Sequence, residues 1–362
     1  MISNMARVSD NNERIRRDQW HLTFLRTSEA HRITQGSGVV VAVPDTGVYP
    51  HPDLARNLLV GIDIIPGGRG DGRQDLDSHG TSMAGLIAAH GQADEVGALG
   101  IAPRAKILPI FDSPPNSEGD PEALALGIEY ATRSGVGVIS VSSGGATNPR
   151  LTQAVQTALA TDIVVVAAAG NRPEDVSVGY PASEDGVIAV GGVGRSGARA
   201  EVSVTGPEVD VVAPAVDIYS TSYDGKYSKG TGTSSATAIV AGAAALIRSK
   251  YPDMSAREVA HRLTATAVDK GPPGRDDEYG YGVIDIVAAL TADVPPLGSG
   301  TPPTTAPVAG GTTATAAPDG ADYGATVRGL VTLGVLVAVG VTWAVLVRRR
   351  RRGDDPPPRI SR

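Results

Sequence analysis

The chain has 362 residues, of which 41% are apolar and 20% are charged, and this composition excludes a wholly disordered protein. It contains no cysteine, which excludes disulfides, thiol catalysis and cysteine metal sites. Residues 1–290 carry 24 basic and 34 acidic side chains, and an acidic body lacks the clustered positive charge with which proteins bind nucleic acid. We therefore expect no nucleic acid among the partners.

The part of the chain between residues 36 and 290 alternates short apolar runs with segments of helical periodicity. The apolar runs are continuous, which is typical of parallel strands covered on both faces. Strands are predicted at 39–43, 106–110, 136–140, 162–169 and 187–193, and helices at 78–90, 121–134, 148–161, 234–251 and 255–266. This order predicts an α/β fold, a three-layer sandwich around a mostly parallel sheet.

The chain ends differ from this body. Residues 1–35 are predicted to be an N-terminal lead-in segment, and residues 291–326, rich in Pro, Thr, Ala and Gly, a flexible linker. Residues 329–347 carry no charge, and nineteen helical residues span about 29 Å, close to the hydrocarbon thickness of a bilayer. One C-terminal transmembrane helix is therefore predicted there, followed by a basic cytoplasmic tail over 348–362.

Membrane orientation follows from the five consecutive arginines at 348–352, because basic flanks stay in the cytoplasm. They predict a single-pass protein of the cell membrane with its body outside. A secretory signal needs an apolar run of 7 to 15 residues, and residues 1–35 contain none. Two explanations stay open, an upstream start and insertion of the tail after synthesis; we expect the upstream start.

Three polar residues stand where strands end or helices begin, which is where open α/β sheets place their working groups. Asp45 ends an apolar strand, His79 opens a helix, and Ser234 follows the Gly-rich turn 230–233 into an Ala-rich helix. A serine becomes nucleophilic beside an imidazole, and a carboxylate holds that imidazole in the required tautomer. These residue types predict nucleophilic catalysis by serine.

These three segments, in the order Asp, His, Ser, resemble the active-site motifs of the subtilases, the subtilisin-like serine proteases. Further motifs match along the body: His51-Pro52-Asp53-Leu54, Gly100-Ile101-Ala102-Pro103, Ala168-Ala169-Gly170-Asn171, Tyr180-Pro181-Ala182, Ala213-Pro214 and Gly280-Tyr281-Gly282. The resemblance covers about residues 18 to 290. It implies a subtilisin-like catalytic domain over 36–290 that cleaves peptide bonds through an acyl-enzyme.

The resemblance also implies a role for each matching position. Asp45 would orient the imidazole, His79 would act as general base and then acid, and Ser234 would attack the scissile carbonyl. Asn171 and Ser234 would form the oxyanion hole. An extended polypeptide substrate would pair as an added strand with two segments. These are Ser142, Ser143 and Gly144, and Ala168, Ala169 and Gly170.

Two positions depart from the family pattern. Ala238 stands where the family usually has proline. Pro44 precedes Asp45 at a position where a sheet residue is expected, and proline removes a ladder donor in a central strand. A catalytically impaired scaffold that binds peptides or stabilises a secretion complex is therefore an alternative. An esterase with the same triad is another, although Ser234 lacks the G-x-S-x-G elbow of α/β-hydrolases.

A subtilase body followed by a linker, one membrane helix and a basic tip resembles the mycosins, membrane-anchored proteases of type VII secretion systems. That resemblance implies secretion-system components as partners. The absence of cysteine and of a visible signal peptide departs from the mycosin pattern. No cofactor is predicted, and no metal site, because structural calcium, common in subtilases, has no supporting motif of the EF-hand kind here.

Overall fold

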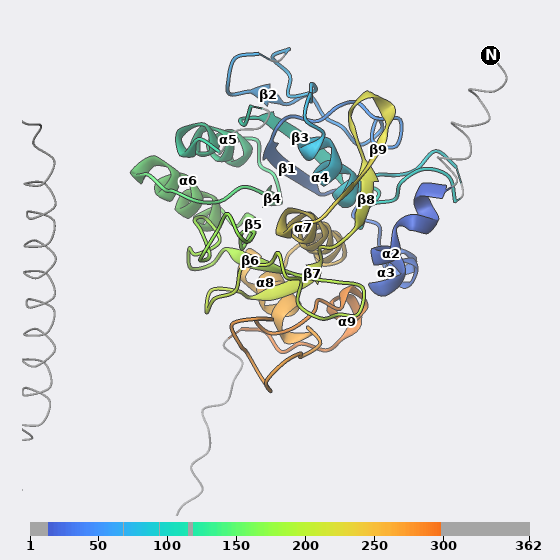
Figure 1. Ribbon diagram of the computed structural model, residues 1–362, viewed down its shortest axis with the longest axis vertical. Helices are drawn as coiled ribbons and strands as arrows, with labels where there is room; N and C mark the ends of the chain where they lie inside the picture. The colour runs from blue at the N-terminus through green and yellow to red at the C-terminus, as the bar shows by residue number, and fades with distance from the viewer. Residues whose placement is uncertain (1–13, 68, 94, 115–118, 298–362) are drawn as a thin grey trace, which may run out of the picture. The chain divides into compact units, whose positions relative to one another are not determined.

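A seven-stranded sheet forms the centre of the computed structural model, in the order β2-β3-β1-β4-β5-β6-β7, and every neighbouring pair is parallel (Figure 1). Its strands are β1 (Val40–Asp45), β2 (Ile62–Asp63), β3 (Lys106–Phe111), β4 (Val138–Val141), β5 (Val164–Ala168), β6 (Ile188–Val193) and β7 (Val211–Pro214). A two-stranded antiparallel ribbon, β8 (Ile218–Thr221) and β9 (Tyr227–Gly230), lies apart from this sheet.

The structure describes residues 14–297, except 68, 94 and 115–118. The predicted transmembrane helix, the basic tail and all but the first residues of the predicted linker fall outside this part. Within it, no helix combines the length and the apolar character that crossing a membrane requires.

Helices cover both faces of the sheet. Along β1, Val41 and Val43 point into one apolar cluster with residues of α4 (His79–Ala88), α7 (Thr233–Lys250) and α8 (Ala256–Ala265). Ala42 points into a second cluster with α5 (Pro121–Arg133) and α6 (Pro149–Ala160). Because successive strand residues face opposite sides, both faces must be apolar, which explains the continuous apolar runs. The predicted α/β sandwich around a mostly parallel sheet is confirmed.

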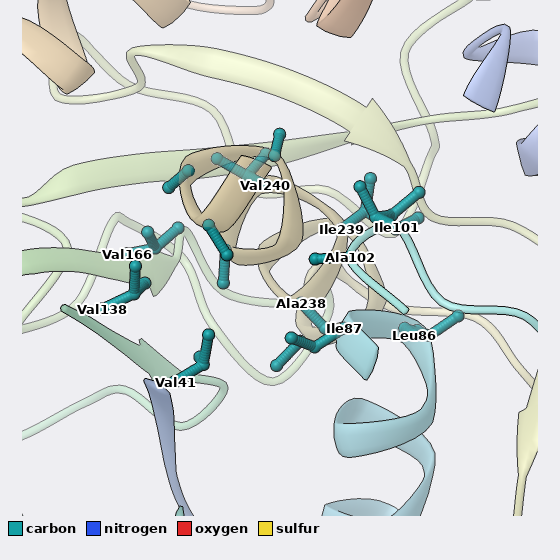
Figure 2. Packing of buried hydrophobic residues seen from close by; sticks show 14 of the residues in the cluster. Val41, Leu86, Ile87, Ile101, Ala102, Val138, Val166, Ala238, Ile239 and Val240 are labelled. Atoms are coloured by element: carbon teal, nitrogen blue, oxygen red, sulfur yellow. The ribbon is translucent and has the colours of Figure 1, made fainter. Parts of the chain in front are cut away.

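Helix α7 runs through the middle of the first cluster, and its residues from Thr233 to Ile247 are all buried. Figure 2 shows valines of neighbouring strands, Val41, Val138 and Val166, beside this helix. A Cβ on Gly242 would lie 2.7 Å from that of Ile101, so the helix needs its small residues to pack this closely. Ala238, fully buried, continues the helix at the position where the family usually has proline.

Local sequence sets where several helices begin. Asp120 accepts a hydrogen bond from the Glu122 N–H at the start of α5, and Asn148 accepts one from the Leu151 N–H at the start of α6. Each cap is followed by proline at the first helical position, where a missing N–H costs nothing. These two helices begin one residue after their caps.

The lead-in segment belongs to the same body. It forms α2 (Trp20–Phe24) and α3 (Thr27–Ile33), and Leu22 and Leu25 enter the first apolar cluster. Arg26 donates to both carboxylate oxygens of Asp285, at 2.6 and 2.5 Å, and Asp285 caps α9 (Ile286–Thr291). This contact joins the beginning and the end of the described chain.

All ten predicted strands and helices are present, with ends within two residues of the prediction. The sequence reading did not predict α2, α3, α9, β2, β7, β8 or β9. Most of these are short, and β7 carries the motif Ala213-Pro214, which was assigned to the family resemblance without an element type.

Candidate active site

The candidate site lies where the strand order of the sheet reverses. After β1 the chain forms β2 and β3 on one side of β1, and from β3 it crosses to β4 on the other side. Open α/β sheets bind ligands at the carboxyl ends of strands at such a reversal. Asp45 is the last residue of β1, and Ser142 directly follows β4.

Pro44 does not displace Asp45 from the sheet. Asp45 keeps its register opposite Phe111 of β3, and Pro44 is opposite Ile110. The ladder between β1 and β4 covers only Val41 and Ala42, so Pro44 lies beyond it, close to the end of the strand. A proline there costs less than it would in the middle of the ladder.

Asp45 and His79 form a direct pair. The His79 Nδ1 lies 2.8 Å from Asp45 Oδ1 and 2.9 Å from Oδ2, and the Thr46 N–H donates to Oδ1 at 2.7 Å. The Asp45 side chain is 5% exposed and that of His79 is 38% exposed. Gly80 permits this approach, because a Cβ there would lie 2.1 Å from the Gly47 carbonyl oxygen. The imidazole thus has one nitrogen on a buried carboxylate and an accessible face.

A second set of hydrogen bonds, absent from the sequence prediction, supports this pair. The Thr46 hydroxyl donates to Asp75 Oδ1 at 3.0 Å and accepts from the Gly80 N–H at 3.0 Å. Asp75 Oδ2 accepts from the N–H and the hydroxyl of Thr81, at 2.9 and 2.5 Å. These bonds tie the end of β1 to the first turn of α4. The only sign of this network in the sequence was Asp75, a carboxylate four residues before His79.

The acidic surroundings raise the pKa of His79 to about 9, chiefly through the charge of Asp45. Burial opposes this shift, while the hydrogen bond to Asp45 and the charges of Asp77 and Asp75 add to it. The imidazolium form is therefore favoured in the free protein at neutral pH.

Ser234 lies in the first turn of α7 and is almost fully buried. Its hydroxyl donates to the carbonyl oxygen of Ser142 at 3.0 Å. The single proton of this hydroxyl is directed at Ser142. For Ser234 to give that proton to His79, its side-chain torsion must change. The N–H groups of a first helical turn have no partner within their own helix, which leaves that of Ser234 available to an oxyanion.

Asn171 is held against the residue that precedes the serine. Its Oδ1 accepts from the N–H and the hydroxyl of Thr233, at 2.9 and 3.2 Å. Its own N–H donates to Asp175 Oδ2 at 2.7 Å. Because both side-chain contacts use Oδ1, the amide Nδ2 remains the group that can donate to a substrate. Thr233 and Asp175 were not predicted from the sequence.

The two predicted substrate segments differ in their surroundings. Ser142 and Ser143 line a pocket of about 270 Å³ together with Asp45 and His79. Gly144 lies beyond them and is exposed. Ala168 and Ala169 are buried at the end of β5, the Ala169 N–H donates to Val190, and the Gly170 carbonyl accepts from the Thr233 hydroxyl. Substrate pairing stays a prediction for both segments.

One buried acid near the site was also unpredicted. The N–H groups of Asp112 and Ser113 donate to the Asp45 carbonyl oxygen, at 3.1 and 3.3 Å. Burial, and the nearby charge of Asp45, raise the pKa of the Asp112 carboxyl well above its usual range. Asp112 packs towards Gly127 of α5, so it supports β1 from the other face of the sheet.

Metal binding has no candidate in residues 14–297, apart from the six that are not described there: no three His, Asp or Glu side chains cluster as ligands would.

Comparison with known proteins identifies the family to which this chain belongs. Residues 36–282 match the family model described as the subtilase family, Peptidase_S8. This chain is a subtilase. It is 42% identical over 260 residues to subtilisin DY from Bacillus licheniformis, covering 70% of this chain and 92% of that protein. The predicted family and the prediction of a serine peptidase are thereby confirmed.

Solved structures similar to this subtilase include two secretion proteases. MycP1 from Mycobacterium smegmatis superposes with a TM-score of 0.68 and 30% identity, over 76% of this chain and 85% of that one. The MycP3 protease from the type VII (ESX-3) secretion system gives a TM-score of 0.65 and 34% identity, over 76% and 88%. The resemblance to mycosins is therefore seen in the fold as well as in the sequence.

Proposed function

We propose that this subtilase is a serine endopeptidase in which Asp45, His79 and Ser234 cleave polypeptides through an acyl-enzyme. The contact between both Asp45 oxygens and His79 Nδ1 carries the proposal. In the neutral imidazole, this contact places the proton on Nδ1 and leaves Nε2 as the nitrogen that can accept a proton. The pair differs from an ordinary surface ion pair, because the Asp45 carboxylate is buried and the adjacent Thr46 is hydrogen-bonded to buried Asp75.

In the proposed reaction, Ser234 gives its proton to His79 as its oxygen attacks the scissile carbonyl. Asn171 Nδ2 and the Ser234 N–H donate to the oxygen on which negative charge develops. The imidazolium, stabilised by Asp45, then protonates the leaving amine. Water repeats the sequence on the acyl-enzyme, with His79 again acting as base and the Ser234 hydroxyl restored.

Peptide hydrolysis by the full 362-residue chain tests this proposal. We expect the wild type to cleave unstructured peptides and Ser234→Ala to lose cleavage while circular dichroism stays unchanged. Cleavage that survives in a folded Ser234→Ala protein would remove Ser234 from the nucleophile role. Ester substrates run in parallel separate a peptidase from an esterase.

A second part of the proposal concerns the cellular location of the protein and its orientation in the membrane. We infer a single-pass protein of the cell membrane whose catalytic domain lies outside and whose basic tail is cytoplasmic. The uncharged segment 329–347 and the arginines 348–352 support it. Protease added to intact cells should remove the body and leave a short fragment that carries a C-terminal epitope tag. A body that stays protected until the cells are lysed would contradict this orientation.

The last part of the proposal is an association with type VII secretion. It is supported by the similarity to MycP1, described as an essential component of the type VII (ESX-1) secretion system. Deletion of the gene should reduce export of proteins that a type VII system secretes, and the wild-type gene should restore it. Unchanged export would contradict the association and leave the peptidase proposal intact.

A catalytically impaired scaffold remains the second candidate, because the Ser234 hydroxyl is directed at Ser142 in this structure. The same deletion distinguishes the two. If Ser234→Ala restores export as fully as the wild type, binding matters and cleavage does not.

A further inference from the structure

The residue before His79 has an unusual backbone conformation. Ser78 has a φ of 97° and a ψ of −17°, on the side of the Ramachandran plot where residues with a side chain are strained. The other described non-glycine residues with positive φ lie between 52° and 64°, in the narrow left-handed region that such residues do visit. Strain of this kind persists where the surrounding structure enforces it, and it is common beside active sites. The contacts of Ser78 must therefore hold it.

Two hydrogen bonds fix Ser78 in this conformation. Its N–H donates to Asp75 Oδ1 at 2.9 Å, and its hydroxyl oxygen lies 2.8 Å from that of Ser222. Because φ is the rotation about the bond between N and Cα, fixing the N–H on one side and the side chain on the other fixes φ. The side chain of an N-cap residue usually accepts from its own helix, but that of Ser78 makes no such bond with α4. The Ser78 hydroxyl binds the ribbon instead.

Ser222 presents its hydroxyl from a well-supported place. It directly follows β8 at the tip of the ribbon and is only 5% exposed. The two residues before it, Ser220 and Thr221, donate from their hydroxyls to carbonyl oxygens of α4, at 2.8 and 2.7 Å, so β8 lies beside that helix (Figure 1). The ribbon thus meets the beginning of α4 through three consecutive hydroxyls.

The same ribbon leads to the nucleophile. β9 ends at Gly230, and Ser234 lies four residues later in the first turn of α7. The turn between them is fixed to the body, because the Gly232 N–H donates to the Ala215 carbonyl oxygen at 2.9 Å. One hairpin therefore contacts the helix that carries His79 and delivers the chain to Ser234. A misplacement of about 1 Å between reacting groups can cost about 100-fold in rate, so this connection bears on catalysis.

We propose that Ser222 is a positioning residue, whose hydroxyl holds Ser78 in its strained conformation and so fixes His79 relative to Ser234. This inference rests on the proposed peptidase function, because it gives the contact a part in the same reaction. Asp45 holds the imidazole ring, and Ser222 holds the backbone that carries it. Ser222 therefore acts through Ser78 and not on the reacting atoms.

Peptide hydrolysis by variants of the full chain tests this role. Ser222→Ala should lower kcat about tenfold and change KM less than twofold, because peptide binding does not require the serine and the imidazole to be aligned. Ser220→Ala is the matched control, since it removes a hydroxyl of the same ribbon that bonds to Ser82, three residues beyond His79. It should cost similar thermal stability but keep kcat within about twofold of the wild type.

Substitutions of Ser78 separate strain from hydrogen bonding. Ser78→Ala keeps a Cβ at a φ of 97° but loses the hydroxyl that holds it there, so kcat should fall about tenfold. Ser78→Gly loses the same hydroxyl, yet glycine adopts positive φ without strain, so it should be at least about fivefold more active than Ser78→Ala. Adding Ser222→Ala to Ser78→Ala should change kcat little, because the two hydroxyls form one contact.

Full kcat in Ser222→Ala, or an equal loss in Ser220→Ala, would overturn the positioning role, as would a Ser78→Gly variant no more active than Ser78→Ala. All three results leave the peptidase function standing. If the wild type cleaves no peptide, the peptidase proposal fails, and denaturant unfolding tests the strained contact by itself. Greater stability of Ser78→Gly than of Ser78→Ala then supports that contact, and the reverse order overturns it.

Discussion

His79 lies at the carboxyl edge of the sheet with 38% of its side chain exposed, whereas His21 lies in α2 with none exposed. Asp45 raises the pKa of His79 to about 9. Burial lowers the pKa of His21 to about 3, and neither of its ring nitrogens has a partner in the part of the chain that the structure describes. A paired imidazole is poised to hold a proton, and an unpaired buried one excludes it.

The two histidines therefore affect stability with opposite signs. The paired His79 stabilises the folded protein most below about pH 6.5, and this contribution is lost as the pH rises through about 9. The contribution of neutral His21 is present above about pH 6.5 and is lost as the pH falls towards about 3. A buried position does not by itself make a histidine a base. The carboxylate beside His79, which His21 lacks, makes the difference.

The largest predicted effect comes from removing the paired histidine. His79→Ala should lower kcat by about 10⁶-fold, the loss known for the same residue types in subtilisin, because members of a catalytic unit fail together. Peptide hydrolysis measures it. His261→Ala is the control and should stay active, because His261 lies on α8 and lines a pocket with Ile188, the first residue of β6. Comparable losses in both variants would point to misfolding instead.

Replacing the carboxylate sharpens the comparison further. Asp45→Asn should reduce kcat by about 10⁴-fold, because the amide favours the wrong tautomer of His79. It should also move the acid limb of kcat/KM from near pH 9 towards 6.5, since the main cause of the raised pKa is gone. An activated substrate keeps the residual rate measurable. An unmoved limb would mean that Asp45 does not set the titration of His79.

Asn171 tests the oxyanion side of the site. Asn171→Ala should lower kcat by about 10²- to 10³-fold with little change in KM, because the donor acts only in the transition state. Asn171→Asp keeps an oxygen for Thr233 but loses the donor, so it should lose activity while thermal stability is preserved. A large rise in KM in either variant would indicate substrate binding instead.

The smallest effect concerns His21 and stability. Between pH 6.5 and pH 5, protonation of this histidine in the unfolded chain should cost about 2 kcal/mol of folding free energy, at roughly 1.4 kcal/mol per pH unit. His21→Leu removes the titrating ring at similar size. Denaturant unfolding should then lose less stability between pH 8 and pH 5 than the wild type does. Equal losses in both proteins would show that His21 is not the responsible group.

Much of the fold could be predicted because its signals are local. Continuous apolar runs predicted five of the seven strands of the parallel sheet, and the helix predicted to begin at 148 begins one residue later. The short elements α2 and α3 gave no such signal, since their stability comes from contacts distant in sequence, such as Arg26 with Asp285. Nothing in the sequence predicted how β8 and β9 pair.

The candidate site was predicted by motif, and its supporting residues were not. The positions of Asp45, His79, Asn171 and Ser234 follow from the family pattern, although their roles remain predictions. Thr46, Asp75 and Thr81 could not be assigned, because a threonine or aspartate in a turn is common for reasons unrelated to catalysis. Their function depends on which segments the fold brings together.

The rate at which a fluorophosphonate labels Ser234 in the full chain, measured by mass spectrometry between pH 6 and pH 10, tests the central claim most directly. A fluorophosphonate reacts with an activated serine, and this reaction does not depend on which peptide sequences the enzyme prefers. We predict a single labelled site, Ser234, with a rate that rises to a plateau and an apparent pKa near 9 that falls in Asp45→Asn. An unlabelled Ser234 at pH 10, or a rate independent of pH, would contradict a triad built on the Asp45–His79 pair.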